Sequence, residues 1–323
     1  MKIGIVVNPN SGNREAFRRF LPSLAPALNG KRIYCTASTL IYVQDHLRPQ
    51  VIGSKEVTKD FRDTEHAGRD LAEMDMILSF GGDGTVSDLI YGMRSTGKQV
   101  PIANVALGTA NCGPFTAFRS AEDVARFDFN RIAPQWTRGL DVFEDGQYRG
   151  TAFNDVVISD TLVSTVDNEI KTVDAARFFY QSERILKHPG TIDTEDCFVA
   201  VNGRAILPQG RISQIILSPF SQKEEQFYAF RAVNGLFCKI PYCDSHSGMI
   251  LSSQPIICID DHSDSACADV RQVIFRDKDV VQASNFNAFC ILDGNPRIDL
   301  SRSKEIQIQA NEFAGLCVKE NDQ

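Results

Sequence analysis

The stretch LSFGGDGTVSDLIYGM, residues 78–93, places Gly-Gly-Asp-Gly-Thr directly after an apolar run and directly before a helical pattern. Three glycines in four positions cost backbone entropy on folding, so this turn needs either positive φ angles or close approach of its backbone to another group. In an open α/β sheet, ligands bind outside the carboxyl ends of the strands, where the following helix presents unpaired N–H groups. The sequence therefore predicts a ligand-binding turn made of Gly81, Gly82, Asp83, Gly84 and Thr85.

Within this turn, Asp83 carries the only ionisable side chain. Its carboxylate is placed to accept a proton or to hold Mg²⁺ through a water molecule, while the glycines let a phosphate or a ribose reach the main chain. The alternative is an ordinary strand-to-helix turn in which Asp83 or Thr85 is the N-cap.

Two further turns have the same small, polar character. VVNPNSG, residues 6–12, follows the opening strand, and NVALGTANCGPFTAF, residues 104–118, follows a later one. Because three such turns after strands of one sheet line one rim, we predict a nucleotide-sized crevice there. The candidate binding residues in these two turns are Asn8, Ser11, Gly12, Gly108, Thr109 and Asn111.

The hydrophobic pattern divides the chain into two parts. Up to about residue 126, short apolar runs alternate with helical stretches, which predicts βαβ units and a parallel, Rossmann-like sheet. Beyond residue 134, β-branched and aromatic runs end in Gly, Asp or Asn, which predicts a mainly antiparallel β-sandwich with one helix in residues 173–188. We expect domains at 1–130 and 131–323, joined near 134–139, with the final segment packing back on the first domain.

The composition argues against several classes of function. The chain has 323 residues, 43% of them hydrophobic, and a net charge of −7, which argues against a broad positive field for nucleic acid. The sequence shows no apolar run long enough to span a bilayer and no signal peptide, so we expect a cytoplasmic protein without stable membrane insertion. Nine scattered cysteines without a C-x-x-C pair predict reduced thiols rather than a metal site.

The motifs resemble one superfamily, that of the NAD kinases and the diacylglycerol and sphingosine kinases. NPNSG, GGDGTVSDLIYGM and ALGTAN are similar to its nucleotide-binding half, and ALGTAN with NPNSG leans toward the lipid kinases. TAFNDVVISD, residues 151–160, is similar to the motif in which NAD kinases hold the dinucleotide, so the resemblance implies that Asn154 and Asp155 bind the phosphoryl acceptor. AFCILDGNPRIDLSRSKEIQIQA, residues 288–310, resembles the strand-turn-strand ending of both branches.

One segment departs from the NAD kinases. Where they carry Thr-Pro-Thr-Gly-Ser-Thr-Ala-Tyr, this chain has LSPFSQKEEQFYAF, residues 217–230, and only Ser218 remains there as a weak candidate for substrate contact. This departure leaves two alternatives to an NAD kinase. One is a family member that phosphorylates another nucleotide or a polyol, and the other is a regulatory module that binds a nucleotide without turnover.

The resemblance implies phosphoryl transfer from ATP to a hydroxyl. Asp83 would accept the hydroxyl proton, and Mg²⁺ or Mn²⁺ with main-chain N–H groups would neutralise the phosphates, because neither GGDGT nor NPNSG brings a lysine. NAD or NADH, phosphorylated at the adenosine ribose, is the expected acceptor, and a lipid is the alternative. We also expect small-molecule nucleotide substrates as the partners, and a homo-oligomer.

Three other features are set aside. His246 lacks the G-x-S-x-G turn of a hydrolase. The acidic run at 260–269 lacks the glycine and the spacing of an EF-hand. The arginines of REAFRRF, residues 14–20, are expected on the exposed face of the first helix rather than on a phosphate.

Overall fold

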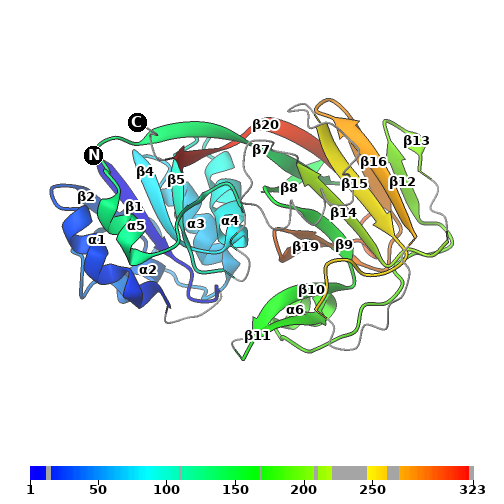
Figure 1. Cartoon of the computed structure of the whole chain (residues 1–323), viewed down its shortest axis with the longest axis horizontal. Helices are drawn as coiled ribbons and strands as arrows, with labels where there is room; N and C mark the ends of the chain where they lie inside the picture. Colours follow the sequence, from blue (N-terminus) through cyan, green and yellow to red (C-terminus); the bar gives the residue numbers. More distant parts are fainter. Residues whose placement is uncertain are drawn as a thin grey trace. The chain divides into compact units, whose positions relative to one another are not determined.

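Figure 1 shows the computed structural model of the chain, which describes residues 1–11, 16–108, 111, 113–167, 169–206, 210–219, 246–259 and 269–319. The chain forms two compact units, the first comprising Met1–Thr137 with Gly315–Gln323 and the second Arg138–Ala314. The strands β7 (Ala133–Glu144) and β20 (Ile306–Lys319) contribute residues to both units.

Unit 1 is built from strands and helices in alternation. Its strands run in the order β20–β5–β4–β1–β2–β3, with β6 also paired to β5, and the pairs described between them are parallel. The strands are β1 (Lys2–Val7), β2 (Arg32–Cys35), β3 (Gln50–Val51), β4 (Met76–Gly81), β5 (Ile102–Ala106) and β6 (Thr116–Phe118). The helices are the 3₁₀ turn η1 (Ala16–Arg19), α1 (Leu21–Ala27), α2 (Ala37–Val43), α3 (Phe61–Asp70), α4 (Asp83–Arg94) and α5 (Ala121–Arg126).

Helix α4, which begins inside the glycine-rich turn, packs closely against α3. A Cβ atom on Gly92 would lie 1.9 Å from the carbonyl oxygen of Glu65, and one on Gly68 would lie 2.1 Å from that of Leu89. Glycine is therefore needed at both positions, because any side chain would force the two backbones apart. This close packing holds α4 in place behind the turn.

Unit 2 is mainly antiparallel. A six-stranded sheet runs in the order β16–β15–β14–β9–β18–β19, and β13–β12–β17 continues onto the first residues of β20. The strands are β8 (Gln147–Ala152), β9 (Val156–Ser159), β10 (Thr161–Val166), β11 (Glu169–Asp174), β12 (Phe198–Val201), β13 (Arg204–Ala205), β14 (Gln214–Pro219), β15 (His246–Ser252), β16 (Val270–Arg276), β17 (Val280–Ser284), β18 (Phe289–Leu292) and β19 (Asn295–Asp299). The two units confirm the predicted fold class.

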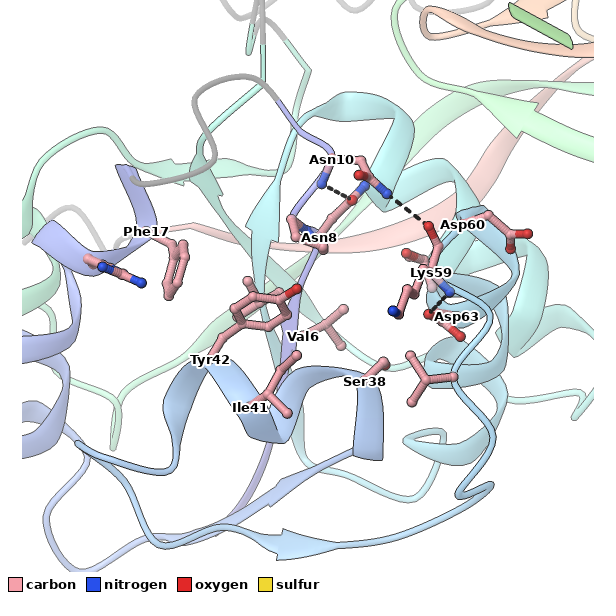
Figure 2. Close-up of a pocket in the computed structure, with 15 residues that line it drawn as sticks. Val6, Asn8, Asn10, Phe17, Ser38, Ile41, Tyr42, Lys59, Asp60 and Asp63 are labelled. Atoms are coloured by element: carbon pink, nitrogen blue, oxygen red, sulfur yellow. Dashed lines mark hydrogen bonds between the residues drawn. The ribbon is translucent and has the colours of Figure 1, made fainter. Parts of the chain in front are cut away.

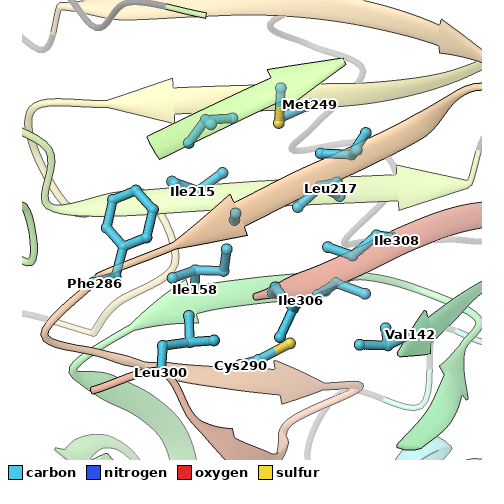
Figure 3. Close-up of a cluster of buried hydrophobic side chains, with 14 of the residues drawn as sticks. Val142, Ile158, Ile215, Leu217, Met249, Phe286, Cys290, Leu300, Ile306 and Ile308 are labelled. Carbon is cyan, nitrogen blue, oxygen red and sulfur yellow. The ribbon is translucent and has the colours of Figure 1, made fainter. Parts of the chain in front are cut away.

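The core of unit 2 lies between its layers of strands. Ile158, Leu217 and Met249 come from the six-stranded sheet, and Val142 and Ile308 come from β7 and β20, all of them buried (Figure 3). The opposite face of the six-stranded sheet packs against the β10–β11 hairpin and α6 (Ala175–Gln181). The inner strands β14, β9 and β18 are therefore buried on both faces.

The helix expected in residues 173–188 is much shorter than predicted. Val173 belongs to β11, and α6 ends where Ser182 adopts a left-handed conformation with φ of 57°. Beyond it, the carbonyl oxygen of Ile185 accepts a hydrogen bond from the N–H of Asp174, and Leu186 pairs with Val173. The apolar residues at 185 and 186 thus follow an extended segment, so the helical interpretation was wrong there.

Across the residues that the structure describes, no helix has the length and the apolar character needed to cross a membrane.

Candidate functional site

The first two predicted turns meet at the carboxyl ends of β1 and β4. The Asn8 side chain donates a hydrogen bond from Nδ2 to Thr85 Oγ1 at 2.9 Å, and its main-chain N–H donates to the Phe80 carbonyl oxygen at 2.9 Å. Asn8 Oδ1 in turn accepts from the N–H of Asn10 at 3.0 Å, which closes the turn. Asn8 and Thr85, two of the predicted site residues, are thus brought together although 77 positions separate them.

The glycines of the site serve close approach rather than unusual backbone angles. Gly82, the N-cap of α4, has φ of −96°, and Gly81 and Gly108 have no positive φ either. A Cβ on Gly108 would lie 2.4 Å from Gly82 Cα, and one on Gly82 would lie 2.9 Å from Gly108 Cα and 3.3 Å from Ser11 Oγ. All three turns therefore converge at Gly82, as predicted, with Gly84 in the first turn of α4.

The third turn is locked by one asparagine side chain. Asn111 has a left-handed φ of 51°, and its amide both accepts from the Gly108 N–H and donates to the Gly108 carbonyl oxygen, each at 2.6 Å. The Arg119 guanidinium donates to the Asn111 carbonyl oxygen at 3.2 Å. The sequence indicated Asn111 but not Arg119, which brings a positive charge to this turn.

Asp83 connects the glycine-rich turn after β4 with the turn after β5. It is the first residue of α4, half-buried, and its Oδ1 accepts a hydrogen bond from the Gly113 N–H at 3.0 Å. A carboxylate in the first turn of a helix is stabilised by the positive end of the helix dipole. Asp83 is therefore an oriented carboxylate beside a bare glycine backbone.

A cavity of about 310 Å³ opens beside Asn8 (Figure 2). One side is apolar, formed by Val6, Ile41 and the edge-to-face pair of Phe17 and Tyr42, whose ring centroids lie 5.4 Å apart. The polar side is formed by Asn8, Asn10, Ser38, Lys59, Asp60, Asp63 and Thr64. Apolar walls with a few polar groups are typical of a site for a flat organic ring that carries hydrogen-bonding atoms.

Helix α3 shapes the polar side of this cavity. Asp63 accepts hydrogen bonds from the N–H groups of Thr58 and Lys59, both at 2.8 Å, and Asn10 Nδ2 reaches the Lys59 carbonyl oxygen at 3.2 Å. Asp60 is the N-cap of α3, and its hydrogen bond with the Arg62 guanidinium lowers the pKa of the carboxyl to about 2. Asp60 is therefore ionised at every ordinary pH.

Sequence reasoning missed most of this cavity. Most of the missed residues lie in two segments, TASTLIYV (36–43) after β2 and VTKDFRDT (57–64), which runs into the first turn of α3. Neither segment contains glycine. The position of Ser38 just after β2 was the available signal. Arg18, which we expected on an exposed face, is exposed and also lines the cavity.

Asn154 and Asp155 lie in unit 2, in the loop between β8 and β9. They are 7% and 8% exposed. The Asp293 carboxylate accepts hydrogen bonds from the N–H groups of both residues, and Ser218 Oγ donates to the Asn154 carbonyl oxygen at 2.8 Å. Ser218 is 1% exposed, so its hydroxyl supports this loop.

Three sequence predictions lie outside the described residues. They are Gly12, Thr109 and, apart from 217–219, the segment that departs from the NAD kinases.

Two sequence comparisons relate the chain to known proteins. Residues 2–142 match the family model of the diacylglycerol kinase catalytic domain. An uncharacterized protein of Archaeoglobus fulgidus is 31% identical over 236 residues, which cover 68% of this chain and 73% of that protein.

Solved structures share the fold at low identity. A diacylglycerol kinase from Bacillus anthracis is similar with a TM-score of 0.55 at 15% identity, covering 99% of this chain and 97% of that one. Yeast NADH kinase, solved with NADH, gives a TM-score of 0.51 at 12% identity and covers 99% and 84%. The chain belongs to the superfamily of kinases that unites the diacylglycerol kinases with the NAD kinases.

Proposed function

We propose that this kinase transfers the γ-phosphoryl group of ATP to a hydroxyl on the adenosine ribose of NAD or NADH. The turns that meet at Gly82 would bind the phosphates of ATP through main-chain N–H groups. The neighbouring cavity, with its apolar wall and polar rim, would hold the adenosine of ATP.

In this reaction, the ribose hydroxyl oxygen attacks the γ-phosphorus, and the bond from that phosphorus to the β,γ-bridging oxygen breaks. ADP leaves with the bonding electrons, and the hydroxyl proton passes to the Asp83 carboxylate. An ordinary Asp is a weak base, with a pKa near 3.9, but a loose transition state requires little proton transfer before the new bond forms. The hydrogen bond from Gly113 to Asp83 Oδ1 would supply the orientation that matters more.

Mg²⁺ is the implied cofactor, and it would neutralise charge on the β- and γ-phosphates. Among the described residues, no group of three or more His, Cys, Asp or Glu side chains is placed to hold a metal ion. Mg²⁺ that is bound to nucleotide phosphates needs only one or two protein carboxylates, and Asp83 has the right donor chemistry to contact it through water. The residues present therefore fit this cofactor.

The observation that carries the choice of phosphoryl acceptor is the buried polar pair, Asn154 and Asp155. A buried amide and carboxylate suit ribose hydroxyls, because such side chains form hydrogen bonds with the polar groups of a substrate. A lipid acceptor is the second candidate, favoured by the match to the diacylglycerol kinase model. A nucleotide-binding module without turnover is the third.

The test is a direct assay of purified protein with ATP and Mg²⁺ against NAD, NADH, diacylglycerol and sphingosine. Product on NAD or NADH supports the proposal, and product on a lipid alone overturns it. Absence of any product, with ATP still raising the melting temperature, favours the binding module or an acceptor outside this panel.

Asp155→Ala sharpens the test. We expect it to weaken use of NAD by about 2 kcal/mol or more, because a buried hydrogen bond to the substrate is lost. Asp196→Ala, at an exposed position in the same unit, is the matched control. Equal use of NAD by both variants would remove Asp155 from acceptor binding.

A further inference from the structure

The turn between β18 and β19 carries an acidic side chain where the backbone does not require one. Asp293 and Gly294 have φ of 49° and 84°, the left-handed pair of a tight hairpin turn. Asn or Gly meets this requirement as well as Asp does. The geometry of the turn therefore does not explain why residue 293 carries a carboxylate.

That carboxylate collects three consecutive main-chain N–H groups. Oδ1 accepts from Phe153 at 3.1 Å, from Asn154 at 2.8 Å and from Asp155 at 3.2 Å, while Oδ2 accepts from Phe153 at 2.8 Å. The N–H of Asp293 donates back to the Asp155 carbonyl oxygen at 3.1 Å. Hydrogen bonds to an ionised acceptor are stronger than neutral ones, so the loop is bound tightly around this one side chain.

The three N–H groups belong to residues that lie between two strands, since β8 ends at Ala152 and β9 begins at Val156. Leu292 pairs with Val156, which brings the Asp293 turn beside the loop. On β14, which also pairs with β9, Ser218 Oγ holds the Asn154 carbonyl oxygen at 2.8 Å. The backbone of Asn154 is thus held from two places, its N–H by Asp293 in the β18–β19 turn and its carbonyl oxygen by Ser218 in β14.

We propose that Asp293 is the positioning residue of the phosphoryl-acceptor site: it acts through the backbone of residues 153–155 to set where the Asn154 and Asp155 side chains point. The proposal rests on the proposed function, in which these two side chains bind the acceptor. The proposed reaction gives no chemical step to the turn of Asp293 and Gly294, and the positioning role explains its carboxylate.

The test is Asp293→Asn with Asp193→Asn as its matched control. Asn preserves size and tolerates the left-handed turn, but its NH₂ group cannot accept the hydrogen bond that the Phe153 N–H donates to Oδ2, and it carries no charge to strengthen the bonds to Oδ1. Asp193 also accepts a main-chain hydrogen bond in unit 2, from Ile212 at 3.0 Å, which lies outside the 153–155 loop. Ser218→Ala is a second variant that loosens the same loop from the other side.

The readouts are the KM values for ATP and for whichever acceptor the wild type phosphorylates, with hydrogen–deuterium exchange of residues 153–155. We expect Asp293→Asn to raise the acceptor KM at least about tenfold and the ATP KM less than about twofold, with faster exchange in the loop. Ser218→Ala should also raise the acceptor KM and speed exchange in the loop, but by less. Asp193→Asn should change neither the acceptor KM nor the exchange.

An unchanged acceptor KM, an equal rise in both KM values, or the same effect from Asp193→Asn would overturn the positioning role. If the wild type uses only a lipid, the proposed acceptor fails while the Asp293 test proceeds on that lipid. If it uses none of the four acceptors, unchanged exchange of 153–155 in Asp293→Asn still rejects the role of Asp293, and faster exchange confined to this loop supports it.

Discussion

Asp83 is the residue whose chemistry the proposed reaction uses most directly. Its carboxylate stands in the first turn of α4, and the Gly113 N–H at 3.0 Å sets its orientation. The hydrogen bond uses Oδ1, an atom that Asn also has. Charge can therefore be removed at this position with little change in shape.

We expect Asp83→Asn to lower kcat by at least about a hundredfold, because a positioned proton acceptor contributes about that much or more. The melting temperature should stay near that of the wild type, since the amide oxygen still accepts from Gly113. Steady-state kinetics and a thermal melt on the same preparation give both values. A variant with near-normal turnover would exclude Asp83 from the chemistry.

At the scale of elements, the β4–α4 and β5 turns depend on glycine because their backbones touch. Gly82→Ala would place a methyl group 2.9 Å from Gly108 Cα, and the obstacle is main chain rather than a flexible side chain. We expect a loss of stability of about 1–3 kcal/mol, the usual effect of overpacking, together with weaker ATP binding. Urea unfolding and calorimetric titration measure the two effects.

Gly4→Ala is the control for that variant, because the nearest neighbours of its methyl group would be the side chains of Leu71 and Met74, at 3.1 Å and 3.2 Å, rather than main chain. It should lower stability without changing ATP affinity. If Gly82→Ala binds ATP as tightly as Gly4→Ala does, the turns do not form the phosphate site.

Helix α3 supplies a prediction that depends on pH. The hydrogen bond with Arg62, and that with Thr58, lower the pKa of Asp60 to about 2, below its ordinary value of 3.8. A lowered folded-state pKa means that the stabilisation is complete above about pH 4 and is lost as the pH falls from 4 toward 2. Asp60→Asn keeps an N-cap but removes the charge.

We therefore expect Asp60→Asn to be less stable than the wild type at pH 7 by about 0.5–1 kcal/mol, a modest figure because the Arg62 side chain is 58% exposed. The gap should shrink between pH 4 and pH 2. Urea unfolding of both proteins at several pH values measures it. A gap that is constant or widens on acidification would contradict the assigned cause.

At the scale of the whole molecule, the proposed reaction requires a divalent cation. Turnover should vanish in EDTA and return with Mg²⁺ or Mn²⁺, because the charge on a transferring phosphoryl group must be neutralised and the GGDGT and NPNSG turns supply no lysine. The melting temperature without ATP is the control, and chelation should leave it unchanged. Full activity in chelator would reject the proposed chemistry.

The sequence by itself determined the fold class and the three turns after β1, β4 and β5. These are local properties, because strand and helix periods and glycine-rich turns can be recognised within about ten consecutive residues. The same reasoning failed at residues 182–186, where a left-handed Ser182 and pairing with β11 override the helical spacing of the apolar residues.

Only the tertiary structure decided why the glycines are needed and what surrounds them. The approach of Gly82 to Gly108, the cavity between Tyr42 and Asp60, and the hold of Asp293 on residues 153–155 all join segments far apart in the chain. A residue pattern reports on the local backbone, whereas these contacts arise from the order and register of the strands. For that reason the sequence indicated Asn154 and Asp155 but not the side chain that holds them.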